Sequence, residues 1–74
     1  MFRHRNWVYS VHFVAQRIDT ISTKFGSMTI IVSNKVNRLN LEGSFKFFKE
    51  VIKENYEDIT DNIMITGFTY LGRE

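Results

Sequence analysis

The chain of 74 residues carries ten Lys or Arg and eight Asp or Glu, for a formal net charge of +2, and it has no cysteine and no proline. This length allows a single domain over residues 1–74, and so small a domain buries only about 60% of its unfolded surface. The lack of cysteine excludes disulfides, thiolate metal sites and cysteine catalysis. Good packing and self-association remain as the ways to gain stability.

The sequence carries no catalytic or cofactor-binding motif. Its four glycines fit no phosphate-binding fingerprint, and no nucleophile-elbow sequence is present. The two histidines, His4 and His12, are too few for a zinc site without carboxylates, and the acidic residues between positions 54 and 61 lack the spacing of a calcium loop. We therefore expect a protein that is not an enzyme and that binds no cofactor and no metal.

The same patterns bear on location and source. No run of eighteen apolar residues is present, so we expect no membrane partner. The basic and apolar start lacks the small-residue cleavage site of a signal peptide, which favours a cytoplasmic location. The chain is rich in Phe, Ile, Asn and Lys and has one alanine, a bias typical of AT-rich accessory genes. A phage or prophage protein that modulates a host protein is therefore one hypothesis.

Residues Trp7–Gln16 alternate with a period of two, which predicts a β-strand. The odd-numbered residues form the more apolar face, which is expected to meet the helix. Val8 and Val14 add apolar residues to the other face, and a strand that is apolar on both sides favours the middle of a sheet. Residues 1–6, ahead of this strand, are predicted to form a flexible lead.

Residues 17–26 break this alternation and predict a loop that ends at Gly26, a residue suited to a positive φ angle. Three apolar side chains of this loop are expected to fold back onto the domain: Ile18, Ile21 and Phe25. Alternation resumes over Met28–Asn34, which predicts a second strand. One face of that strand is more hydrophilic than either face of the first, which favours a position at the edge of the sheet.

Asn40–Tyr56 is the only stretch with a sustained helical period. Its apolar residues recur at steps of four, three and four: Leu41, Phe45, Phe48 and Ile52. Asn40 is expected to cap the helix by accepting a hydrogen bond from the first turn. Phe47 lies about 100° around the helix from Phe48, at the border of the apolar stripe, where it is either a second contact point or a shielded edge residue.

Beyond the helix, the acidic residues 57–62 predict a turn, and Ile63–Leu71 predict a third strand. Ile63 and Ile65 share the face that is expected to meet the helix. The opposite face of this strand is expected to carry Met64, Phe68 and Tyr70.

The order β–β–α–β predicts an α+β fold, with a three-stranded sheet and one helix packed on one face. A crossover through a helix sets the third strand parallel to the second. With the first strand in the middle, the strand order is second, first, third. One helix cannot cover both faces, so one face should stay open. This open face is predicted to bind a partner through Val8, His12, Val14, Ile31, Met64, Phe68 and Tyr70, with Phe47 as a second contact point.

Two functions fit such a face. Apolar side chains rimmed by charge are typical of protein-binding surfaces, and the partner is another protein or a second copy in a homodimer. The alternative is binding of single-stranded nucleic acid, in which Phe68, Tyr70 and His12 stack on bases. Residues 1–40 carry a net charge of +5 and residues 41–74 a net charge of −3. This asymmetry favours solvated faces that complement each other in the fold, and the alternative is an anionic partner for the basic half. The candidate phosphate-binding residues of this basic half are Arg3, Arg5, Arg17, Lys24 and Arg38. The aromatic–glycine signature of RNA-recognition domains is missing, which favours the protein-binding hypothesis.

Overall fold

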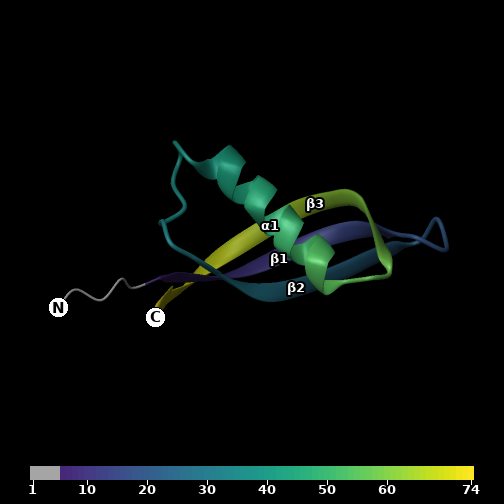
Figure 1. The fold of residues 1–74 in the computed structure, drawn as a ribbon, viewed down its shortest axis with the longest axis horizontal. Helices are drawn as coiled ribbons and strands as arrows, with labels where there is room; N and C mark the ends of the chain where they lie inside the picture. Colours follow the sequence, from purple (N-terminus) through teal and green to yellow (C-terminus); the bar gives the residue numbers. More distant parts are fainter. Residues whose placement is uncertain (1–5) are drawn as a thin grey trace.

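The structure, a computed structural model, describes residues 6–74. In chain order it contains β1 (Trp7–Arg17), β2 (Thr23–Val32), α1 (Leu41–Asn55) and β3 (Ile59–Arg73). The strands form one sheet in the order β2-β1-β3, and β1 runs antiparallel to both neighbours (Figure 1). The predicted α+β fold, the strand order and the central place of the first strand are therefore confirmed.

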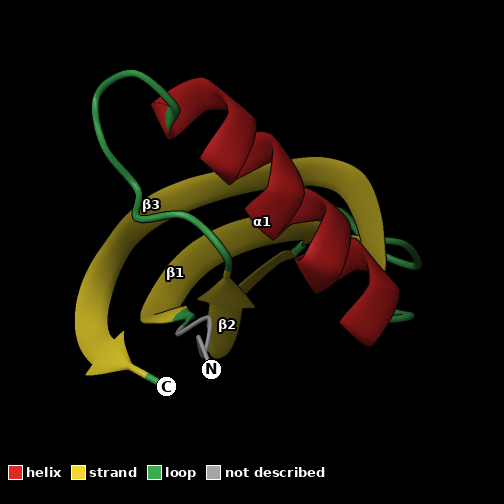
Figure 2. Cartoon of the chain, turned by 60° about the vertical axis from the view of Figure 1, so that its left-hand side comes forward, coloured by secondary structure: helices red, strands yellow, loops and turns green. Residues whose placement is uncertain are grey.

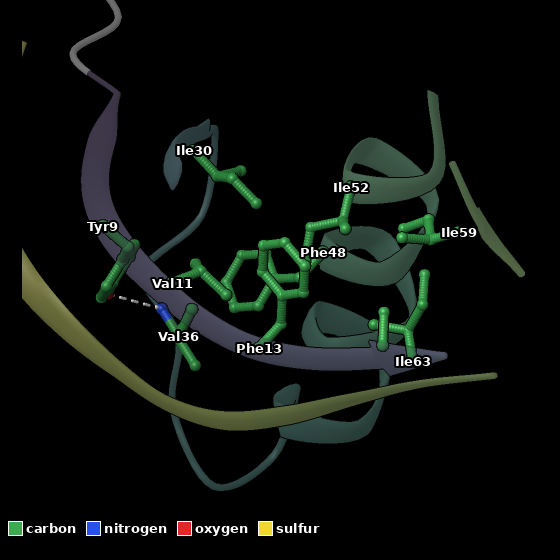
Figure 3. Close-up of a cluster of buried hydrophobic side chains, with 10 residues drawn as sticks. Tyr9, Val11, Phe13, Ile30, Val36, Phe48, Ile52, Ile59 and Ile63 are labelled. Carbon is green, nitrogen blue, oxygen red and sulfur yellow. Dashed lines mark hydrogen bonds between the residues drawn. The ribbon is translucent and has the colours of Figure 1, made fainter. Parts of the chain in front are cut away.

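The core lies between the sheet and α1, which crosses one face of the curved sheet (Figure 2). The odd-numbered residues of β1 face α1, as the alternation predicts. The buried residues are Tyr9, Val11, Phe13, Ala15, Ile30, Val36, Phe48, Ile52, Ile59 and Ile63. Figure 3 shows how Phe13, Phe48 and Ile52 meet at the centre of this cluster. The helix thus buries the face that the sequence assigns to it.

β1 and β2 form a longer hairpin than the alternation predicts. Their register runs without interruption from Trp7 opposite Val32 to Gln16 opposite Thr23, so that only residues 18–22 remain as a turn. The hairpin extends past the end of α1 (Figure 1), so the helix does not cover this part of the sheet. The prediction that the loop folds back onto the domain is therefore wrong for its three apolar residues. Ile18 is 53% exposed, Ile21 96% and Phe25 77%.

Gly26 serves close packing rather than a turn. It lies within β2, opposite Phe13, and among residues 6–74 only Gly72 has a positive φ angle. A Cβ atom at position 26 would stand 2.7 Å from the tip of the Phe13 ring. The prediction of a positive φ angle at Gly26 is therefore wrong. A glycine is needed at this position because a side chain would collide with the buried Phe13 ring.

The helix begins where the sequence predicts, but Asn40 does not cap it with its side chain. The Asn40 Oδ1 atom accepts a hydrogen bond from the Asn37 backbone N–H at 2.7 Å, and its Nδ2 atom donates to the Lys35 carbonyl at 2.8 Å. Asn37 Oδ1 in turn accepts from the Leu39 N–H at 2.8 Å. These side chains therefore fix the loop that leads into α1, instead of closing the first turn of the helix.

β3 is longer and less regular than predicted. It begins at Ile59, which is fully buried, four residues before the predicted start. Its register against β1 shifts at three places, which lie between Val8 and Tyr9, His12 and Phe13, and Ala15 and Arg17. At the middle shift, Phe13 lies opposite Ile65 and His12 opposite Gly67, so Thr66 is an extra residue in a β-bulge.

This bulge reverses the faces of the second half of β3. Phe68 lies opposite Val11 and Tyr70 opposite Tyr9, and directly opposed residues point to the same side of a sheet. The rings of Phe68 and Tyr70 lie 5.7 and 5.5 Å from that of Tyr9, measured between centroids. Both residues are therefore on the side of α1, and their predicted position on the open face is wrong.

The two ends of the described chain meet. The Asn6 N–H donates to the Glu74 carbonyl at 3.0 Å, and the Glu74 N–H donates to the Asn6 carbonyl at 2.9 Å. Asn6 is therefore tied to the sheet and is not part of a flexible lead. The rest of that predicted lead, residues 1–5, lies outside the described residues.

Candidate protein-binding surface

The open face of the sheet is the side turned away from α1. It is built from even-numbered residues of β1, odd-numbered residues of β2 and the residues of β3 that lie opposite them. We use the name for the following set: Val8, Ser10, His12, Val14, Phe25, Ser27, Thr29, Ile31, Met64 and Thr69. Five of the seven predicted partner-binding residues of this face are in the set, and only Phe68 and Tyr70 are not.

The hairpin end of the open face carries an apolar cluster. Val14 lies opposite Phe25 of β2 and opposite Met64 of β3, so the three side chains form a row across the sheet. Ile21 of the turn lines the same shallow hollow of about 300 Å³ as Val14 and Met64. We call these four residues the hairpin patch. Three of them are large and strongly exposed, with Met64 at 66%.

The middle of the open face is polar. Ser10 lies between Thr29 and Thr69, and His12 lies between Ser27 and Gly67. His12 is exposed, and neither of these neighbours across the sheet offers a carboxylate. The short hydroxyl side chains of Ser10, Ser27, Thr29 and Thr69 can donate hydrogen bonds to a partner and accept them from it. Ordering them costs less entropy than ordering long side chains.

At the other end of the face, a second apolar site lies along β2. Ile31 lies opposite Val8 and is 46% exposed. A groove of about 500 Å³ lies between the end of β2 and α1, and its walls include Ile31, Val32 and Phe47. Phe47 is 42% exposed. The predicted second contact point on the helix therefore stands beside an open-face residue at the same edge of the sheet.

Sequence reasoning missed the most exposed members of the hairpin patch, Ile21 and Phe25. The signal was present, because Phe25, Ser27, Thr29 and Ile31 continue one alternation with a period of two. Gly26 interrupts this alternation, and a glycine among polar residues is typical of a loop, so the predicted strand begins only after it.

The predicted phosphate-binding residues do not gather in one place. Arg3 and Arg5 lie outside the described residues. Arg38 precedes α1, while Arg17 lies at the hairpin end of the sheet (Figure 1). Lys24 points to the side of α1, where its Nζ atom donates to the two carboxylate oxygens of Asp58 at 2.9 and 3.1 Å.

The Lys24–Asp58 pair joins the basic and acidic halves of the chain. The hydrogen bond from Lys24 holds the pKa of the Asp58 carboxyl below its usual value, and the charge of Arg17 acts in the same direction. The Lys24 ammonium also lies 4.5 Å from the centroid of the Tyr56 ring. Lys24 is therefore engaged by a carboxylate of the same chain, and the charge of Arg17 acts on that carboxylate as well.

Comparisons with known proteins give no assignment. The sequence matches no protein-family model and no curated protein, and the structure matches no solved structure. Within residues 6–74, no three His, Asp or Glu side chains lie close enough together to hold a metal ion. The one helix in this part of the chain is too short and too polar to cross a membrane.

Proposed function

We propose that this protein is a non-enzymatic domain that binds another protein through the open face of its sheet. The observation that carries this proposal is the hairpin patch, in which Ile21, Phe25 and Met64 are 96%, 77% and 66% exposed around Val14. Contiguous apolar surfaces of this kind mark interaction sites in monomeric proteins. A marginally stable domain gains stability when such a surface is covered.

The composition of the open face supports a protein partner. It contains no Lys, Arg, Asp or Glu, and charged residues are depleted at the centres of protein interfaces. Phe25 supplies a rigid aromatic ring, and Met64 supplies a flexible thioether that fills irregular gaps. The charged side chains of α1, among them Lys46, Lys49 and Glu50, are exposed on the outer side of the helix.

Support for the nucleic-acid alternative is weaker. A stacking platform needs aromatic rings with a free face next to cations that reach the phosphates. The Phe68 ring instead packs between Tyr9 and Phe45, with centroids 5.7 Å from each.

The proposal can be tested by capturing partners from an extract of the source cells on the immobilised protein. Met64→Lys places a charge in the hairpin patch, while Leu71→Lys changes a residue of the same strand that is 56% exposed and lies at the other end. We expect a protein that is retained by the wild type and by Leu71→Lys, and lost with Met64→Lys. Quantitative mass spectrometry measures retention, and circular dichroism confirms that all three baits are folded.

Equal retention of that protein by the three baits would contradict the proposal. Retention of single-stranded oligonucleotides at low salt, with a steep loss as salt rises, would instead favour the nucleic-acid alternative.

A further inference from the structure

β2 is an edge strand with an unused row of backbone groups. At the hairpin end, the Arg17 N–H donates to the Ser22 carbonyl at 3.1 Å, whereas the next N–H, of Ile18, donates to the Asp58 carbonyl at 2.9 Å. Bonding directions alternate along a strand, so odd-numbered residues of β1 bond to β2 and even-numbered residues bond to β3. The backbone N–H and C=O groups of the even-numbered residues of β2 therefore point inward and bond to β1. The N–H and C=O groups of its odd-numbered residues point outward, at Thr23, Phe25, Ser27, Thr29 and Ile31.

The two edges of the sheet differ in a way that favours β2 for pairing. The register of β3 is broken at three places, and bulges at an edge disrupt the pattern that another strand would need. β2 pairs with β1 over ten residues without a shift, contains no proline and has one charged residue, Lys24. The bulges that protect an edge from strand pairing are thus present on β3 and missing on β2, where Lys24 is the one charged residue.

We propose that a second copy of this chain pairs antiparallel with β2, about a two-fold axis at Met28, so that two sheets join into one. The proposal rests on the function proposed above and deepens it, because the two open faces become one continuous face. In this register Phe25 lies opposite Ile31 of the second copy, and Ser27 lies opposite Thr29 of the second copy.

The side-chain pattern of β2 selects this register. About Met28, apolar residues meet apolar residues and hydroxyl residues meet hydroxyl residues on the open face. An axis at Ser27 would place Phe25 opposite Thr29, and an axis at Thr29 would place Ser27 opposite Ile31. An axis between two residues would place an outward-bonding residue opposite an inward-bonding one, and no ladder would form. The segment is therefore self-complementary in one register.

Charge and area are compatible with this pairing. The two copies of Lys24 would stand eight residue steps apart, or about 27 Å, and each is already bonded to Asp58. A covered phenylalanine side chain buries about 150–250 Å², so two copies of Phe25, each 77% exposed, offer roughly 230–380 Å². Ile31, Met28 and the backbone edge add to this, toward the total of about 1,000 Å² that a specific interface needs.

Cysteine cross-linking tests the register, because the chain has no cysteine of its own. With the axis at Met28, a Met28→Cys variant brings two thiols onto directly opposed positions, within the reach of a disulfide. Ser27→Cys and Thr29→Cys each place the thiols two residues out of register. We expect mild oxidation to yield a covalent dimer of Met28→Cys first, and much more slowly of the other two variants.

Sedimentation velocity tests the association itself. The wild type should show a dimer whose fraction rises with concentration. Ile31→Lys, which sets an unpaired charge against Phe25 of the second copy, should raise the dissociation constant by about ten-fold or more. Leu71→Lys on β3 should leave the dissociation constant of the dimer unchanged. Met64→Lys should also leave it unchanged, although it abolishes partner capture under the proposed function, so the two proposals can fail independently.

Three outcomes would overturn the proposal. The first is a wild type that stays monomeric at high micromolar concentration. The second is faster cross-linking of Ser27→Cys or Thr29→Cys than of Met28→Cys. The third is protection of the Ser27 and Thr29 amides from hydrogen exchange only when a captured protein is added, which would assign this edge to that protein.

Discussion

Gly26 shows how closely single residues of this small core depend on one another. A methyl group at position 26 would stand 2.7 Å from the ring of Phe13, which is 1% exposed and cannot swing away freely. Gly26→Ala should therefore lower the free energy of unfolding by about 1–3 kcal/mol. Gly67→Ala is the control, because a Cβ atom there meets nothing within 4 Å. Urea denaturation measures both variants, and equal midpoints would contradict the packing described for Phe13.

The hydroxyl of Tyr9 ties the loop before α1 to the sheet. It accepts a hydrogen bond from the buried backbone N–H of Val36 at 3.0 Å (Figure 3). Tyr9→Phe keeps the ring but leaves that N–H without a partner, which should cost about 1–3 kcal/mol of stability. Hydrogen exchange at the Val36 amide should also become faster. An unchanged exchange rate would show that the amide is protected by other means.

Asp58 should give the stability a dependence on pH. Its pKa is lowered in the folded state by the hydrogen bond from Lys24, so the pair stabilises the fold above the unfolded pKa, and this contribution is lost as the pH falls through the folded pKa. The Tm of the wild type should therefore exceed that of Asp58→Asn at neutral pH, and the gap should close below about pH 4.

Asp61→Asn is the matched control for this pair, since the Asp61 side chain is 94% exposed and lies 4.0 Å from Lys53. Its Tm difference from the wild type should be smaller at neutral pH. A gap for Asp58→Asn that widened as the pH fell would contradict the role assigned to Lys24.

At the scale of the elements, α1 holds the fold together through one narrow face. Phe48 is fully buried between Tyr9, Phe45 and Phe68, whereas Lys49, the next residue, is exposed. Phe48→Ala should cost about 3–5 kcal/mol because it removes a buried ring from a small core. Lys49→Ala should stay within about 0.5 kcal/mol of the wild type. Similar thermal midpoints would mean that α1 is packed differently.

Periodicity predicts the existence and order of these elements better than their ends. The helix and the central strand carry long, regular patterns, and both lie within two residues of their predicted bounds. The Thr66 bulge leaves the alternation of Ile63 and Ile65 intact and reverses the facing of the residues after it, so only pairing against β1 reveals the side of Phe68. Most of the open face, including Met64 on β3, could thus be predicted from the sequence, while the facing of the β3 residues after Thr66 could not.

At the scale of the whole molecule, one helix covers one side of a sheet that extends beyond it. This leaves the hairpin patch and the outer edge of β2 without a covering element among the described residues (Figure 1). Opposite charges of the two halves of the chain meet at the surface, at Lys24 and Asp58, on the side of α1 and not on the open face. The side away from α1 is therefore the part of the molecule that we propose for association.

Nuclear magnetic resonance of the ¹⁵N-labelled protein tests most directly whether the open face is the binding surface. Spectra are recorded from low micromolar to millimolar concentration and with any captured protein partner. We predict that the amide signals of Val14, Phe25, Thr29 and Met64 shift, while those of Lys46 and Lys49 on the outer side of α1 stay in place. Shifts concentrated on α1, with the open face unchanged in every sample, would contradict this assignment.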